Sequence, residues 1–156
     1  KIIKPLKKLS DYDLLTETYS RLFLDKWLKN NCKKLRYIVM IDLDDFKSIN
    51  DEYGHMIGDK VLVYFSKILK EKMNSKDLVI RFGGDEFILI FNNLDEININ
   101  NIMKEIIDEV KNQEKFGFNI NFSYGIQKLE EKKEFFRSIE KADNKMYKMK
   151  NTLKTC

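Results

Sequence analysis

Apolar residues recur along the chain at two spacings, which predict alternating helices and strands. Intervals of three or four residues predict amphipathic helices near 19–30, from just after Gly58 to Asn74, near 102–110 and near 135–149. Nearly unbroken apolar runs predict buried strands at 37–43, 78–80 and 87–91, and alternating apolar and polar residues predict another at 118–124. After the first helix the order is β-α-β-β-α-β, that of the ferredoxin-like plan. We therefore expect an α/β (α+β) fold with a central, mostly antiparallel sheet flanked by helices.

The segment between two of these strands combines glycines with acids. Gly83 and Gly84 predict a tight hairpin turn, because glycine accepts a positive φ and lets another backbone or a ligand come close. Asp85 and Glu86 follow, and acidic side chains fixed on such a turn suit a divalent cation and, through it, a phosphate. The alternative is a solvated turn that happens to be acidic, since charged turns are common.

Asp42 favours a metal site over that alternative. It lies at the C-terminal end of the predicted strand 37–43, where open sheets usually place ligands. If this strand lies beside the hairpin, Asp42 and Asp85 approach each other from neighbouring strands and can share a metal. Two carboxylates in an otherwise apolar sheet are unfavourable unless a cation pairs with them.

Five blocks of the sequence resemble the GGDEF family, the diguanylate cyclases. Residues 83–87 (GGDEF) match the motif that names the family, and residues 42–62 (DLDDFKSINDEYGHMIGDKVL) are similar to its second block. The match is completed by an entry block, a late strand and a last helix: Asp13-Leu14-Leu15-Thr16 with Arg21, Ser123-Tyr124-Gly125-Ile126, and Ala142-Asp143 with Tyr147 and Lys150. These blocks follow the family's order and spacing from about Asp13 to Lys154.

The resemblance implies a polymerase-palm-like nucleotidyl cyclase fold and a reaction. Two GTP molecules would condense into cyclic di-GMP and two pyrophosphates by metal-assisted attack of a ribose 3′-OH across a homodimer. Mg²⁺ or Mn²⁺, two ions in each site, would be held by Asp42, the Leu43 carbonyl, Asp85 and Glu86. Asp85 would also accept the hydroxyl proton.

By the same resemblance, further positions would contact GTP. Asn50 and Asp59 would hydrogen-bond the guanine base, and His55 would lie near it. Gly83 and Gly84 would let the triphosphate lie against the turn. The remaining roles fall to lysines, with Lys47 neutralising charge on the phosphates and Lys150 and Lys154 clamping the triphosphate tail.

Two alternatives stay open. The chain could be a catalytically silent member that binds GTP as a sensor or docking module, although it keeps the residues that degenerate members usually lose. Glu17, Thr18 and Ser20 do depart from the family's usual Gly, Leu and Asn. Asp59 could merely cap a helix beginning near Lys60. An acid there nevertheless favours GTP over ATP, because guanine offers it N1–H and amine donors that adenine lacks.

Composition agrees with one globular enzyme domain. The chain has 156 residues, of which 43% are hydrophobic and 12% aromatic, which excludes disorder. No apolar run approaches membrane-spanning length, and no P-loop motif occurs. The net charge is +4, and we expect most of the lysines to lie on solvated helix faces and not to bind nucleic acid. Cys32 and Cys156 imply no disulfide framework, which favours the cytoplasm.

The domain boundaries are predicted from the extent of the resemblance. We expect residues 10–156 to be the catalytic domain and residues 1–9 to end a linker from an upstream sensory or receiver domain. The full-length protein could be anchored to a membrane through such other regions. This fragment itself is not expected to insert into a membrane.

The family's product-inhibition motif, R-x-x-D upstream of the glycines, is incomplete here. Residues 74–77 read NSKD, so Asp77 is present, but Asn74 replaces the arginine that would grip a phosphate or guanine. We predict no strong feedback inhibition through this segment. Initial rates measured over a series of cyclic di-GMP concentrations should stay constant, and a fall at low-micromolar product would contradict this.

Overall fold

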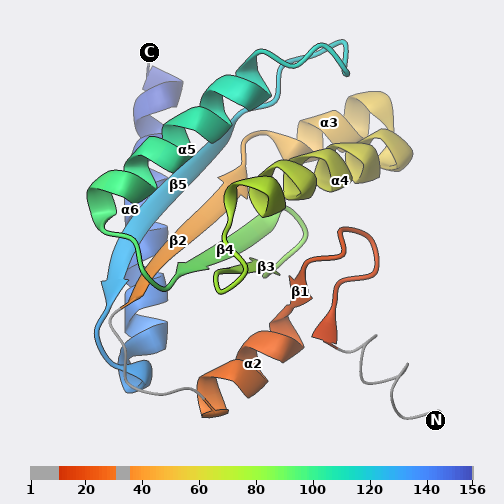
Figure 1. Ribbon diagram of the computed structural model, residues 1–156. Helices are drawn as coiled ribbons and strands as arrows, with labels where there is room; N and C mark the ends of the chain where they lie inside the picture. Colours follow the sequence, from red (N-terminus) through yellow and green to blue (C-terminus); the bar gives the residue numbers. More distant parts are fainter. Residues whose placement is uncertain (1–10, 31–35, 156) are drawn as a thin grey trace, which may run out of the picture.

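Five strands form one sheet in the order β1-β3-β4-β2-β5 (Figure 1). Neighbouring strands are antiparallel except β1 and β3, which are parallel. The computed structural model describes residues 11–30 and 36–155, so the predicted linker at 1–9 lies outside the described residues. The strands are β1 (Tyr19–Ser20), β2 (Arg36–Leu43), β3 (Leu78–Arg81), β4 (Glu86–Phe91) and β5 (Phe122–Leu129).

Helices cover both faces of the sheet (Figure 1). Two of them, α4 (His55–Lys72) and α5 (Glu96–Lys111), pack on one face, while α2 (Arg21–Asn30) and α6 (Phe135–Thr155) pack on the other. A short helix, α3 (Phe46–Tyr53), precedes α4. From β2 to β5 the elements follow the predicted β-α-β-β-α-β order, which confirms the fold. In the described ranges, no helix combines the length and apolar composition that crossing a membrane requires.

Strand β2 shows why its sequence is a nearly unbroken apolar run. Successive side chains of a strand point to opposite faces. Val39 and Ile41 accordingly join the core under α4 and α5, while Ile38 and Met40 join the core under α2 and α6. All four are at most 2% exposed. Because both faces are buried, the polar residue Asp42 near the end of the strand stands out from its surroundings.

Helix α6 packs directly on β5 at Gly125. A Cβ on this residue would overlap the α6 backbone at the Ala142 carbonyl oxygen and the Met146 nitrogen. Ala142 is itself fully buried. These small residues let the helix approach the strand closely, which fixes the following turns of α6, including Lys150, relative to the sheet.

Two predicted element boundaries are wrong. The helix predicted to begin after Gly58 begins at His55, with the separate helix α3 just before it. The strand predicted at 118–124 begins only at Phe122 and continues to Leu129. Phe118 lies outside the strand, and its ring instead stacks on Tyr53 of α3, with centroids 4.3 Å apart. Packing on a helix, not pairing in a sheet, explains that part of the pattern.

Glu17 has a backbone conformation that suits glycine. Its φ is 57°, in the left-handed region that residues with a Cβ rarely adopt. It lies in a turn closed by two backbone hydrogen bonds, from Glu17 N–H to the Asp13 carbonyl (2.9 Å) and from Asp13 N–H to the Thr18 carbonyl (2.8 Å). Backbone geometry therefore accounts for the glycine that the family usually has here.

Replacing Glu17 by glycine should raise the free energy of unfolding by about 1 kcal/mol, because a Cβ in the left-handed region is unfavourable by roughly that amount. Equilibrium unfolding in denaturant measures the change. The control Glu17→Ala removes the charge but keeps the Cβ, so its stability should stay within about 0.5 kcal/mol of wild type. Equal stabilisation by both substitutions would contradict a backbone origin.

Candidate active site

Pairing between β2 and β4 brings three of the predicted acids together. Asp42, the second-last residue of β2, lies directly opposite Glu86, the first residue of β4. The Leu43 N–H donates to the carbonyl oxygen of Asp85 at 3.2 Å. Asp42, Asp85 and Glu86 thus meet at one end of the sheet, beside the glycine turn.

Hydrogen bonds hold the glycine turn in place. The Glu86 carbonyl oxygen accepts from the N–H groups of Phe82 at 2.8 Å and Gly83 at 3.3 Å. From the start of the turn, the Arg81 guanidinium donates to the Gly84 carbonyl oxygen through Nη2 at 2.8 Å and Nε at 3.2 Å. Arg81 therefore braces the hairpin.

The two glycines serve different purposes, and neither has a positive φ, so that part of the expectation is wrong. At Gly83 a Cβ would lie 2.5 Å from Oε1 of Glu86, because the Glu86 side chain folds back over the turn. At Gly84 a Cβ would meet nothing within 4 Å. A side chain at the first position would therefore displace the flexible end of Glu86, whereas open space surrounds the second.

Lys150 of α6 extends into the acidic group. Its Nζ lies 2.6 Å from Oδ2 of Asp42 and 3.7 Å from Oδ1 of Asp44. The Ser123 hydroxyl of β5 donates to the same Asp44 oxygen at 2.9 Å. The other oxygen of Asp42, Oδ1, is buried and has no hydrogen-bond partner. Lys150, predicted to clamp a triphosphate, is here paired with a carboxylate of the protein.

Crowding of the acids shifts their protonation equilibria. Burial, together with the nearby charge of Asp42, raises the pKa of Asp85 to about 6. Burial, followed by the charges of Asp42 and Asp143, raises the pKa of Glu86. Burial also raises the pKa of Asp44, against the lowering effect of its hydrogen bond from Ser123. Together, these carboxylates lack enough nearby positive charge to offset burial and their mutual repulsion.

The donor set fits a hard divalent cation, although the side chains do not converge on one point. Asp42, Asp85, Glu86 and the Leu43 carbonyl offer only oxygen ligands, which Mg²⁺ and Mn²⁺ prefer. The buried, partnerless Oδ1 of Asp42 is an acceptor that a cation would satisfy. Among the described residues, no three Asp, Glu, His or Cys side chains are grouped to hold a metal ion. Asp42 is paired with Lys150, and the Glu86 side chain lies over Gly83.

The residues predicted to contact GTP lie mainly on α3 and α4. Lys47 is exposed in the first turn of α3, and Asn50 of the same helix is half-buried. His55 is the first residue of α4, and Asp59 is exposed within that helix. Asp59 therefore caps no helix, and that alternative is wrong. The side chain of Lys154 lies outside the described residues.

Two acids of this site were not predicted from the sequence as site residues. Asp44 lies two residues after Asp42 and shares its lysine partner. The D-x-D spacing was the signal for it in the sequence. Asp143 of α6 lies near enough to Glu86 to raise its pKa. Its proximity depends on how α6 packs across the sheet, which no local pattern reveals.

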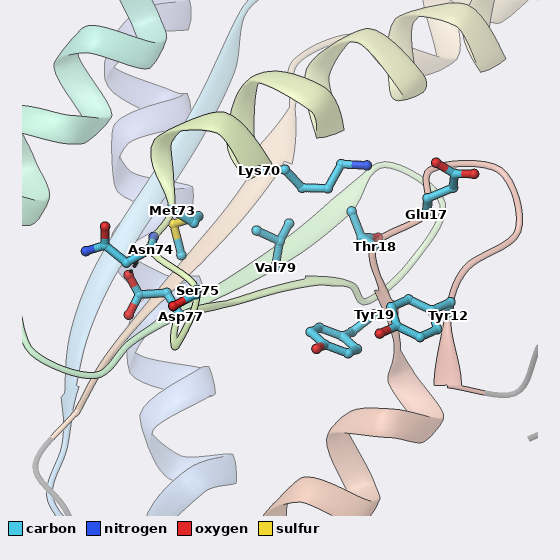
Figure 2. A pocket seen from close by; sticks show the side chains of 10 residues that line it. All are labelled: Tyr12, Glu17, Thr18, Tyr19, Lys70, Met73, Asn74, Ser75, Asp77 and Val79. Atoms are coloured by element: carbon cyan, nitrogen blue, oxygen red, sulfur yellow. Dashed lines mark hydrogen bonds between the residues drawn. The ribbon is translucent and has the colours of Figure 1, made fainter. Parts of the chain in front are cut away.

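A separate pocket of about 300 Å³ includes the segment that resembles the product-inhibition motif (Figure 2). Asn74 and Asp77 line it together with Tyr19 and with Lys70 of α4. The Asp77 carboxylate accepts from the backbone N–H of Asn74 at 3.2 Å and of Asn92 at 3.0 Å. This acid therefore holds its own loop together, and the absence of strong feedback inhibition stays a prediction.

Asp13 links the segment before β1 to the hairpin. Its carboxylate accepts from the Thr16 N–H at 2.9 Å and hydroxyl at 2.7 Å, and it pairs with Arg81 at 3.1 Å. Burial alone would raise the pKa of Asp13, but the bonds from Thr16 and the charge of Arg81 outweigh it and lower that pKa. A lowered folded-state pKa stabilises the fold at pH values above the unfolded pKa. The stabilisation is lost as the pH falls through the folded-state pKa.

The region that contains the sheet and the acidic group matches a known family. Residues 10–156 match the family model described as diguanylate cyclase, GGDEF domain. The sequence is 36% identical to the probable diguanylate cyclase DgcI of Escherichia coli over 139 residues, 88% of this chain. It is 29% identical to the diguanylate cyclase DgcS of Shewanella oneidensis over 153 residues, 93% of this chain. The chain spans 30% of the length of DgcI and 51% of that of DgcS.

The fold is similar to a solved structure of the same class. The coiled coil and GGDEF domain of DgcB from Caulobacter crescentus, solved in complex with c-di-GMP, superimposes with a TM-score of 0.87 at 24% identity. The similarity covers 97% of this chain and 86% of that one. At this identity, the comparison establishes the fold.

Replacing Asp13 by asparagine should lower the free energy of unfolding at pH 7 by roughly 1–2 kcal/mol, because hydrogen bonds to a charged acceptor are lost. The difference from wild type should begin to shrink as the pH falls below about 4, where the carboxylate of the unfolded chain becomes protonated, and should continue to shrink toward the lower pKa of the folded state. Equilibrium unfolding in denaturant, repeated between about pH 3 and pH 7, measures this difference in the free energy of unfolding. Asp25→Asn, exposed on α2, is the matched control. A difference that stays constant over this range would contradict the charge-based explanation.

Proposed function

The chain belongs to the family of diguanylate cyclase GGDEF domains, and we propose that it condenses two GTP molecules into cyclic di-GMP and two pyrophosphates. The observation that best supports this is the meeting of Asp42, Asp85 and Glu86 beside a glycine turn that is open at Gly84. Relatives named diguanylate cyclase match most of this chain. Cyclic di-GMP synthesis is therefore the activity that family and geometry support together.

Asp42, Asp85, Glu86 and the Leu43 carbonyl oxygen are the proposed ligands for Mg²⁺ or Mn²⁺, with two ions in each site. When bound, such ions offset the negative charge of the phosphates and make the ribose hydroxyl more acidic. The chain's own contribution is to fix the oxygen ligands on paired strands. The β2–β4 register sets their separation, and the bonds within the turn limit their motion.

Each half of the proposed reaction forms one phosphorus–oxygen bond and breaks another. The 3′-oxygen of one GTP bonds to the α-phosphorus of the other. The bond from that phosphorus to the oxygen bridging the β-phosphate breaks, and pyrophosphate leaves. Asp85 accepts the hydroxyl proton, and Lys47 offsets charge on the phosphates. The same exchange repeated with the roles of the two nucleotides reversed closes the ring.

Specificity for guanine is assigned to the helices that follow β2. Asn50 on α3 and Asp59 on α4 would hydrogen-bond the base edge, with His55 at the start of α4 near it. Asp59 is exposed, so its carboxylate is accessible to a ligand. An acid in this position accepts from the N1–H and the exocyclic amine of guanine, and adenine lacks that donor pattern.

The proposed reaction needs two copies of the chain. One site holds one GTP, so the attacking and attacked nucleotides must come from two sites that face each other. Activity would depend on association, and a sensory or receiver domain upstream is the proposed controller.

A GTP-binding module without turnover is the second candidate. The ion pair between Lys150 and Asp42 favours it, because it engages an oxygen that the cyclase reaction needs for metal binding. A sensor or docking domain would require only that the nucleotide bind. The two candidates therefore differ in product formation, not in GTP binding.

The test is to incubate the protein at several concentrations with Mg²⁺ and either GTP or ATP, and to separate the products by chromatography. We expect cyclic di-GMP from GTP alone, with a specific activity that rises with protein concentration. Asp85→Asn should lower the rate about 100-fold or more, as loss of a proton acceptor does. Asp108→Asn, exposed on α5, should leave it unchanged.

Three outcomes would contradict parts of the proposal. GTP binding without product, even in a cross-linked dimer, would establish the second candidate in place of the cyclase. Absence of GTP binding would overturn both candidates. An adenine-containing product would contradict the role assigned to Asp59.

A further inference from the structure

The ion pair between Lys150 and Asp42 differs from the surface pairs of this protein. It joins residues 108 positions apart in the sequence, at 2.6 Å. Both side chains are only 18% exposed, and Asp44, the second partner of Lys150, is 14% exposed. By contrast, the Lys133–Glu131 pair at 3.0 Å has side chains 79% and 54% exposed. The Lys150 pair is thus shielded from water, where an ionic interaction has its largest effect.

The surroundings of Lys150 are dominated by negative charge. Asp42 and Asp44 contact it. Burial lowers the pKa of its ammonium group, but the hydrogen bond to Asp42 and the charges of the nearby acids outweigh burial and raise that pKa. Glu86 adds a further acid, whose pKa is raised by burial and by the charges of Asp42 and Asp143, only partly offset by the positive charges of Arg21 and Lys150. Within residues 11–30 and 36–155, Lys150 is the cation in direct contact with the Asp42 carboxylate.

The ion pair with Lys150 engages only one of the two oxygens of the Asp42 carboxylate, which leaves the other oxygen for another cation. Lys150 satisfies Oδ2 of Asp42, whereas the buried Oδ1 has no hydrogen-bond partner. An ammonium group is a single charge on a flexible stem, so it cannot replace a divalent ion for the whole carboxylate group. Because both oxygens belong to one carboxylate, a divalent ion on Oδ1 would lie close to the ammonium group on Oδ2, and the two cations would compete for Asp42.

We propose that Lys150 is the resident counter-ion of the metal-binding carboxylates, and that a divalent cation binds by displacing its ammonium group from Asp42. This inference rests on the proposed function, since it assigns the metal to these acids. Once displaced, the ammonium group is free to meet the triphosphate that the metal accompanies. The lysine thus offsets the charge of the carboxylates and weakens metal binding until nucleotide is present.

Binding of Mn²⁺ alone, followed by electron paramagnetic resonance without nucleotide, tests the competition. Lys150→Met should bind Mn²⁺ about tenfold more tightly than wild type, because the competing charge is gone. Lys150→Gln, which keeps a polar side chain, should behave in the same way if Lys150→Met is poorly folded. Lys148→Met, exposed on the same helix, is the control for a change of net charge and should bind as wild type does.

Displacement itself has a separate readout in the labelling of lysines by an amine-reactive reagent, measured by peptide mass spectrometry. Labelling of Lys150 in the wild type should increase severalfold at saturating Mn²⁺, while labelling of Lys148 stays constant. Unchanged labelling of Lys150 would overturn displacement. Equal Mn²⁺ affinity of wild type and Lys150→Met, or no binding by either, would overturn competition.

The outcome is independent of whether the protein turns over GTP. If Lys150→Met binds Mn²⁺ more tightly and Asp42→Asn abolishes binding, the inference stands even for a silent GTP-binding module. If wild type makes cyclic di-GMP but Lys150 neither competes with Mn²⁺ nor is released by it, the inference fails and the proposed function stands.

Discussion

The antiparallel register between β2 and β4 determines where the acids of this protein meet. Because Asp42 is paired with Glu86, the end of one strand and the start of the next form a single acidic edge. Side chains alternate between faces, so a slip of one residue would turn Asp42 away and drive the apolar residues of β2 onto the wrong faces. Two separate cores, one under α4 and α5 and one under α2 and α6, oppose such a slip. The hydrophobic packing of the whole domain therefore positions the chemistry.

The second constraint is electrostatic. Several carboxylates share one end of the sheet, and burial raises the pKa of Asp85, Glu86 and Asp44. Such a group is unfavourable without a cation. In this structure the cation is Lys150, which α6 presents because the helix lies tightly against Gly125. The turn is braced by Arg81, whose guanidinium donates to the Gly84 carbonyl oxygen and not to these acids.

Much of this architecture could be predicted from sequence, and the failures have physical causes. Long apolar runs located β2 and β4, and their ends placed Asp42 near Asp85. The pattern failed at Phe118, because stacking on Tyr53 produces the same alternation as a strand. At Gly83 and Gly84 positive φ was the wrong reason, and the atom that a Cβ on Gly83 would meet belongs to the Glu86 side chain. The pairing of Lys150 could not be predicted, since it depends on long-range packing of α6.

A crystal structure of the protein with Mn²⁺ and a non-hydrolysable GTP analogue would test the central claim most directly. Anomalous scattering locates manganese without assumption about its ligands. We predict manganese on the oxygens of Asp42 and its neighbours Asp85 or Glu86, with the ammonium group of Lys150 moved from Asp42 to the phosphates. Manganese bound elsewhere, with Lys150 still paired to Asp42, would contradict both the metal assignment and the role of the lysine.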